Sequence, residues 1–286
     1  MVFRISIPLF LISVFISSPS FAGGPWTPKK NGGYAQLSFS AIGSNRLWNN
    51  FDEPFSLYRK VHDLTLQAFA EYGITNNLTL SGTLPFKFVS TGEETFMLDT
   101  LLSSDTFPAG NLSGLSNISL ALKYRLIDTK WKLAVQLKAD TRTTVTDPRT
   151  VLQTGYDCWS YQPMVLFGSS AKAFYFFIST GFTVRSNNFS EAFNVSAEAG
   201  YSFFNRKTQL ILTADLNKSF LNDSTQNTVY LNTGLYVNNQ EFLAYGLKIN
   251  QALGEQWMVN VGVLGAAFGN LVAYAPSFNA GLAYKW

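Results

Sequence analysis

The chain has 286 residues and a formal net charge of +3, from 21 Lys and Arg against 18 Asp and Glu. Charged residues make up 14% of it, where a soluble domain carries about 25%, and this argues against an ordinary cytosolic domain. No long basic run marks a nucleic-acid partner. One Cys and one His exclude an intramolecular disulfide and a multi-histidine metal site, and we expect no metal and no other cofactor.

Residues 1–22 are expected to be a cleaved signal peptide. Arg4 precedes an apolar stretch that is shorter than the roughly 20 residues of a membrane-spanning helix. Ser20 and Ala22 then place small residues where signal peptidase requires them, so we expect cleavage after Ala22. The later sequence contains no long apolar window, which leaves a β-barrel over 23–286 as the remaining way to cross a membrane.

Apolar and polar residues alternate with a period of two from residue 34 onward, which is typical of strands with one apolar and one polar face. The clearest example is the hairpin over 115–142. One face of this hairpin is aliphatic, the other carries its charges, and Tyr124 and Trp131 lie near the turn, where a membrane barrel has an aromatic girdle. Arms of about ten residues suit a tilted membrane strand better than a sandwich strand of five or six.

Thirteen segments have this strand pattern. They are 34–42, 62–72, 78–88, 115–126, 131–142, 157–168, 173–184, 192–203, 208–220, 228–237, 242–251, 257–266 and 275–286. A single-chain bacterial barrel has an even number of strands. We therefore predict an all-β, antiparallel, up-and-down barrel of 12 strands in which a weak segment among 228–266 is a loop. Fourteen strands remain the alternative if one is hidden in 89–113 or 143–156.

Short turns alternate with longer polar segments at 43–60, 89–113 and 143–156, which we expect to be loops. About ten residues separate the cleavage site from the first strand, so no plug domain is expected. Strand parity places a set of mostly charged residues inside the barrel, because a charge facing lipid near the midplane costs roughly 2–4 kcal/mol. The predicted lumen-lining residues are Asp63, Gln67, Glu71, Lys87, Lys123, Arg125, Lys132, Gln136, Lys138, Asp140, Arg142, Glu198, Asp215 and Lys248.

Three functions fit such a barrel. A charged lumen favours a pore or binding groove for a small solute, although opposite charges could instead pair and hold the barrel shut. A lipid-modifying enzyme would need His62, which shares a face with Leu64 and Leu66, but no serine lies in a G-x-S-x-G motif, so we expect no enzyme. A closed structural or adhesive barrel acting through its outer loops is the third possibility.

Two segments resemble one family. Residues 71–80, followed by Leu84, Pro85 and Phe86, and the strand 115–126 are similar to the outer-membrane channel proteins linked to phenol meta-pathway degradation. The resemblance implies passage of small, often aromatic or hydrophobic, compounds across the outer membrane of a Gram-negative bacterium. Asn117 departs from the family, in which this position is commonly acidic.

The last segment alternates and ends at Trp286, which resembles the assembly signal of outer-membrane barrels. The expected partners are therefore the barrel assembly machinery, outer-membrane lipid and a small-molecule solute.

Overall fold

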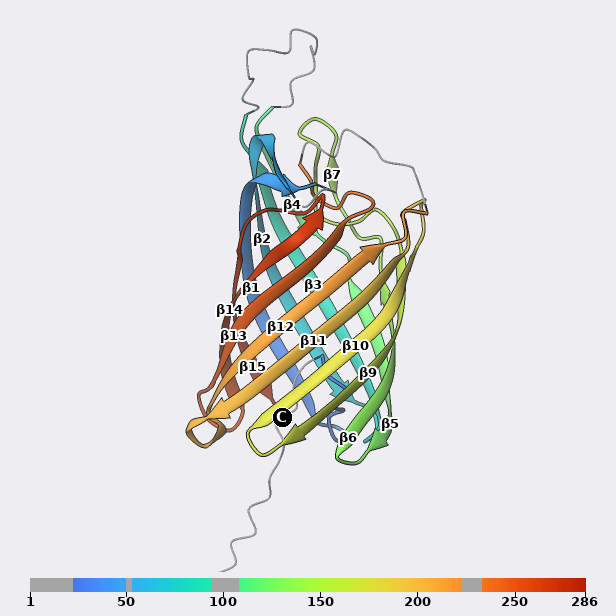
Figure 1. Cartoon of the computed structure of the whole chain (residues 1–286), viewed down its shortest axis with the longest axis vertical. Coiled ribbons are helices and arrows are strands. Elements are labelled where there is room, and N and C mark those ends of the chain that lie inside the picture. Colours follow the sequence, from blue (N-terminus) through green and yellow to red (C-terminus); the bar gives the residue numbers. More distant parts are fainter. Residues whose placement is uncertain (1–22, 50–52, 94–107, 223–232) are drawn as a thin grey trace, which may run out of the picture.

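Figure 1 shows the computed structural model of the chain, an antiparallel β-barrel closed by the pairing of its first and last strands. The structure describes residues 23–49, 53–93, 108–222 and 233–286, without the side chains of Tyr58 and Arg206. The expected signal peptide, residues 1–22, lies outside the described residues. Within these ranges no helix is both long and apolar enough to cross a bilayer.

Thirteen strands build the wall. In chain order they are β1 (Gly33–Trp48), β2 (Pro54–Gly73), β3 (Leu78–Thr91), β4 (Gly110–Leu115), β5 (Ser119–Asp128), β6 (Trp131–Asp140), β9 (Ser160–Ala171), β10 (Phe174–Arg185), β11 (Ala192–Phe203), β12 (Thr208–Ser219), β13 (Glu241–Ala252), β14 (Trp257–Asn270) and β15 (Ser277–Lys285). Both β4 and β5 pair with β3, one after the other, so together they fill one position and the barrel has 12 strands. The short strands β7 (Thr146–Asp147) and β8 (Leu152–Gln153) form a separate hairpin, and η1 (Phe204–Arg206) is a single turn.

The predicted strand count of 12 is confirmed. The weak segment is 228–237, because its described part, residues 233–237, is not a strand. Gly234 and Tyr236 have positive φ there, a conformation that does not continue a β-strand.

The prediction of a loop over 43–60 is wrong, since β1 continues to Trp48 and β2 begins at Pro54. Leu47, Leu57 and Val61 on these extensions form a buried apolar cluster with Leu235 and Ala273 packed against it. Burial of these side chains stabilises the extended strands beyond the predicted ends.

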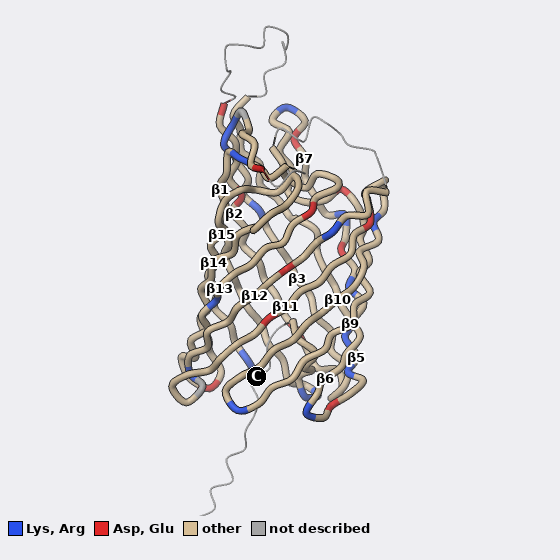
Figure 2. The backbone as a smooth tube through the Cα atoms, in the orientation of Figure 1, with Lys and Arg blue, Asp and Glu red and all other residues tan. Residues whose placement is uncertain are grey.

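Alternation along each strand separates two faces of the wall. Outward-facing side chains such as Leu120, Leu212 and Phe278 are 56%, 60% and 60% exposed, which is the surface expected of a barrel bathed in lipid. Trp131 stacks on Phe167 near the β5–β6 end, where such barrels have an aromatic girdle. Figure 2 shows few charged positions along the strands and more of them at the two ends of the barrel.

Candidate functional site

Three ion pairs lie on the inner face of the wall. Lys87 Nζ is 2.6 Å from Asp63 Oδ2, between β3 and β2. Lys123 Nζ on β5 is 3.7 Å from Glu71 Oε2 on β2, and both side chains are almost completely buried. Lys248 Nζ on β13 is 3.5 Å from Glu198 Oε2 on β11.

The other predicted lumen residues are more scattered. Arg125 and Lys132 both pair with Asp128 at the β5–β6 turn, at one rim of the barrel. Lys138 pairs with Asp140 at 3.2 Å at the other end of β6. Two polar side chains, Gln136 on β6 and Asp215 on β12, are part-buried.

Arg142 lies beyond the last residue of β6, where its half-exposed guanidinium pairs with Asp157. It is therefore the one residue of the predicted set that lies outside the strands of the wall.

A central cavity of 330 Å³ lies within the barrel. Five side-chain amides, three hydroxyl groups, one ion pair and three aliphatic or thioether side chains line it. These residues are Gln36, Gln67, Asn250, Asn260 and Asn279; Tyr34, Ser38 and Ser40; Glu198 and Lys248; and Ile211, Met258 and Leu264. The predicted residues Gln67, Glu198 and Lys248 thus come together at one cavity.

The N-terminal segment before β1 crosses the lumen at one end of this cavity. Residues 24–28 are buried, and the Trp26 ring packs edge-on against Tyr175 at 6.0 Å and Phe177 at 6.1 Å. Ile211, which lines the cavity, belongs to the same apolar cluster. No plug domain was expected, and the short segment before β1 does not form one, but it does place one tryptophan inside the lumen.

Two local features hold this segment in place. Lys123 Nζ donates a hydrogen bond to the Gly24 carbonyl oxygen at 2.9 Å. Gly168 leaves space for Pro25, since a Cβ atom at 168 would lie 3.1 Å from the proline ring. A tryptophan placed before the first strand pattern is the sequence signal that could have indicated a plug.

The opposite end of the lumen is covered by two inward-folded loops, one before β9 and one before β13. Tyr236 donates a hydrogen bond through its hydroxyl group to Asp63 Oδ2 at 3.2 Å, and Lys87 Nζ lies 5.1 Å from the centre of its ring. The Tyr156 ring packs edge-on against Tyr236, and the Arg185 guanidinium lies 4.9 Å from the Tyr156 ring. Burial, aided by the charge of Asp63, raises the pKa of Tyr236 well above its ordinary value, so its hydroxyl group remains a donor.

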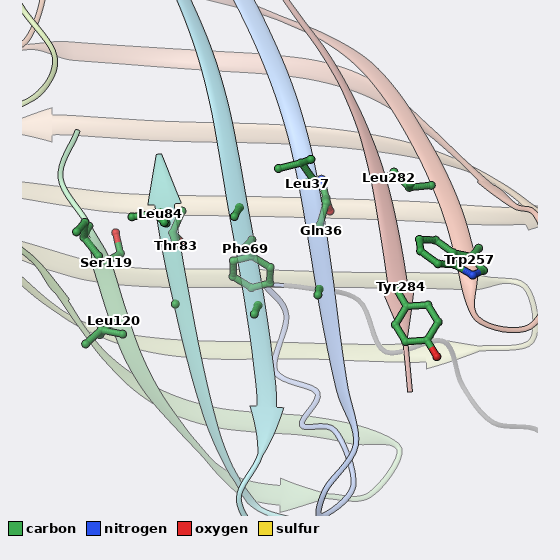
Figure 3. Close-up of a pocket in the computed structure, with 15 residues that line it drawn as sticks. Gln36, Leu37, Phe69, Thr83, Leu84, Ser119, Leu120, Trp257, Leu282 and Tyr284 are labelled. Carbon is green, nitrogen blue, oxygen red and sulfur yellow. The ribbon is translucent and has the colours of Figure 1, made fainter. Parts of the chain in front are cut away.

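An apolar groove of 610 Å³ runs from Trp257 at the start of β14 across β15, β1, β2, β3 and β5. Figure 3 shows the side chains that line it, among them Leu37, Leu84, Leu120 and Trp257. These four side chains face outward and are largely exposed, so lipid chains rather than a polar solute suit this surface. His62 is also exposed on the outward face, and its imidazole has no hydrogen bond or ion pair within the part of the chain that the structure describes.

The family model described as "Putative MetA-pathway of phenol degradation" matches residues 50–265, which is most of the chain. The chain belongs to this family. The resemblance found in the two sequence segments is thereby confirmed. Several solved structures are also similar to the chain. Because their sequence identities are only 7–13%, they show its fold and say nothing about its solute.

The COG4313 outer membrane channel from Pseudomonas putida F1 is 12% identical, with a TM-score of 0.67 over 93% of this chain and 100% of that one. The KdgM porin is 7% identical, with a TM-score of 0.50 over 88% and 99%. The beta domain of the Bordetella autotransporter BrkA is 13% identical, with a TM-score of 0.51 over 90% and 100%. No curated protein matches the chain in sequence.

Proposed function

We propose that this family member is a passive outer-membrane channel for small organic solutes, with a solute pathway along the barrel axis. The observation that carries the proposal is the polar central cavity, which lies inside a wall with an apolar outer surface, between Trp26 at one end and Tyr236 at the other. In this proposal, outer-membrane lipid surrounds the wall and the barrel assembly machinery acts on the last strand. Cleavage of the signal peptide leaves a mature chain that begins at Gly23. The family match supports this assignment.

A closed structural or adhesive barrel is the second candidate. It is favoured by the covers at both ends and by the three ion pairs, which could rigidify the wall rather than serve a solute. A lipid-modifying enzyme receives no support from His62, which has no serine or carboxylate in hydrogen-bond contact among the described residues.

Solute flux separates these candidates. Refolded residues 23–286 in liposomes, with folding verified by heat-modifiable gel migration, should release small trapped solutes faster than protein-free vesicles do. The closed barrel predicts folded protein and no release, and the enzyme predicts lipid hydrolysis that is lost in His62→Ala.

A further inference from the structure

We infer that the barrel has a lateral mouth between β14 and β15, through which small apolar solutes pass between the central cavity and the outer leaflet of the membrane. This route rests on the proposed channel function, because a mouth in the wall serves transport only if the lumen conducts solutes. Three features carry it: an interruption of the strand ladder, the small side chains that border the interruption, and the spaces on its two sides.

The ladder between β14 and β15 ends before β14 does. Its last pair joins Leu264 to Ser277. Beyond this pair, β14 continues along β13 as far as Asn270, whereas residues 271–274 bond to the backbone of β1. The two arms of the hairpin therefore follow different neighbours, and no backbone hydrogen bond joins them across this stretch, all of which the structure describes.

An apolar pocket of 610 Å³ lies on the outer side of this interruption. The two arms contribute mainly small side chains to its lining, which are Gly265, Ala266, Ala275 and Pro276. A Cβ atom at Gly265 would meet nothing within 4 Å. The arms meet again further along, because a Cβ atom at Gly269 would lie 2.5 Å from Val272 Cγ2. Small residues thus leave a bounded open space where the ladder is interrupted.

Leu264 lies at the inner edge of this space. It lines both the outer pocket and the central cavity. Its side chain packs over Gly246, where a Cβ atom would lie 2.7 Å from Leu264 Cγ. Rotamer changes of side chains that are not fully packed are fast, so movement of this one leucine joins the pocket to the cavity.

The interruption between β4 and β5 differs, because hydrogen bonds close it. The Ser116 amide donates to the Pro85 carbonyl oxygen at 3.0 Å. The Asn117 side chain donates to the carbonyl oxygens of Thr141 and Tyr156, both at 2.7 Å. The gap between β14 and β15 lacks such links between its arms in the described structure, so it is the better candidate for a passage.

The position of the mouth suits a solute that dissolves in lipid. Leu212 and Tyr245, which line the outer pocket, are largely exposed on the lipid-facing surface. The interruption lies at the end of the barrel with the longer connections, which is the extracellular end in such barrels. Apolar solutes leave water for hydrocarbon and therefore gather in the leaflet beside the pocket. A lateral mouth admits them without displacing Tyr236, which covers this end of the lumen.

The test follows a thiol in the central cavity. Ser40→Cys in a Cys158→Ala background gives the refolded mature chain a single thiol, at a position that lines the cavity. In liposomes, its reaction is timed with N-phenylmaleimide, which dissolves in lipid, and with a sulfonated maleimide, which does not. We expect Gly265→Trp to slow the first reaction about tenfold, equivalent to a barrier higher by about 1.4 kcal/mol, and to leave the second unchanged.

Gly254→Trp is the matched control. Gly254 lies in the turn between β13 and β14, and a Cβ atom there would also meet nothing within 4 Å, so this variant should react as the parent does. Leu264→Ala should accelerate the reaction with N-phenylmaleimide, because it removes the side chain between the pocket and the cavity. Gly265→Leu replaces Gly265→Trp if heat-modifiable gel migration shows that the larger side chain prevents folding.

The outcomes separate the mouth from the channel function. Equal rates with N-phenylmaleimide in Gly265→Trp and the parent, or equal slowing of both reagents, would overturn the mouth and leave the channel function intact. A folded chain without ion conductance in planar bilayers contradicts the channel function instead. In that chain, selective slowing by Gly265→Trp still supports the mouth, and a thiol that N-phenylmaleimide reaches neither in the parent nor in Leu264→Ala overturns it.

Discussion

Lys123 donates a hydrogen bond to the carbonyl oxygen of Gly24 at 2.9 Å, and the same ammonium group lies 3.7 Å from the Glu71 carboxylate. One buried side chain therefore links strands β5 and β2 of the wall to the segment that crosses the lumen. The stability of the wall and the position of the N-terminal plug are coupled at this residue.

Lys123→Met should destabilise the folded barrel by about 3–5 kcal/mol, because it leaves the Glu71 carboxylate buried without a partner. Adding Glu71→Gln to this variant should recover much of the loss, since the uncompensated charge is then gone. Urea unfolding followed by tryptophan fluorescence measures both effects. Lys248→Met is the control, and because the Lys248 side chain is 34% exposed its loss should be clearly smaller. Equal losses in the two lysine variants would argue against the coupling.

Trp26→Ala should open the end of the lumen that the N-terminal segment crosses. The ring is 7% exposed and packs on Tyr175 and Phe177, so its removal should cost about 3–5 kcal/mol of stability and increase single-channel conductance. Trp131→Ala removes a tryptophan that is 47% exposed on the outer surface and should leave conductance unchanged. Parental conductance in Trp26→Ala would show that the segment does not restrict the pathway.

Tyr236→Ala should open the opposite end and also increase conductance. Tyr236→Phe is the matched control, because it keeps the ring beside Lys87 and loses only the hydrogen bonds of the hydroxyl group, to Asp63 and Ser116, each worth about 1 kcal/mol. Conductance should therefore increase in Tyr236→Ala, which lacks the ring, and stay at the parental value in Tyr236→Phe, which lacks only the hydroxyl group. An equal increase in both variants would mean that the hydrogen bonds, and not the volume of the ring, keep this end covered.

Ion selectivity should depend on the pair between Glu198 and Lys248. Lys248→Met leaves a negative charge in the cavity and should shift the channel toward cations, whereas Glu198→Gln leaves a positive charge and should shift it toward anions. The reversal potential under a salt gradient should therefore move in opposite directions in the two variants. Shifts in one common direction would place the pair outside the ion pathway.

Much of the barrel could be predicted from the sequence because a strand in a single-layer barrel has two chemically different faces. Alternation placed Asp63 and Glu71 on the buried face, and Leu120 and Leu122 of the hairpin over 115–142 on the exposed one. Strand ends were less predictable, because packing between distant segments extends β1 and β2 beyond the alternating pattern.

The covers of the lumen could not be found by alternation. Tyr236 and Asp63 are 173 positions apart in the chain, and no local pattern connects them.

The break between β4 and β5 also depends on contacts with distant residues. Asn117 there donates to the carbonyl oxygens of Thr141 and Tyr156 and accepts from the Tyr156 amide. An amide can play both roles, which an ionised carboxylate cannot, and this gives the departure from the family pattern a structural reason.

The most direct test of the channel function is the single-channel conductance of the refolded mature chain, measured beside the double variant Trp26→Ala with Tyr236→Ala. The account predicts steady conductance in the parent and larger conductance in the double variant, which lacks both rings that cover the cavity. A folded barrel that remains silent even in the double variant would contradict a solute pathway through the lumen.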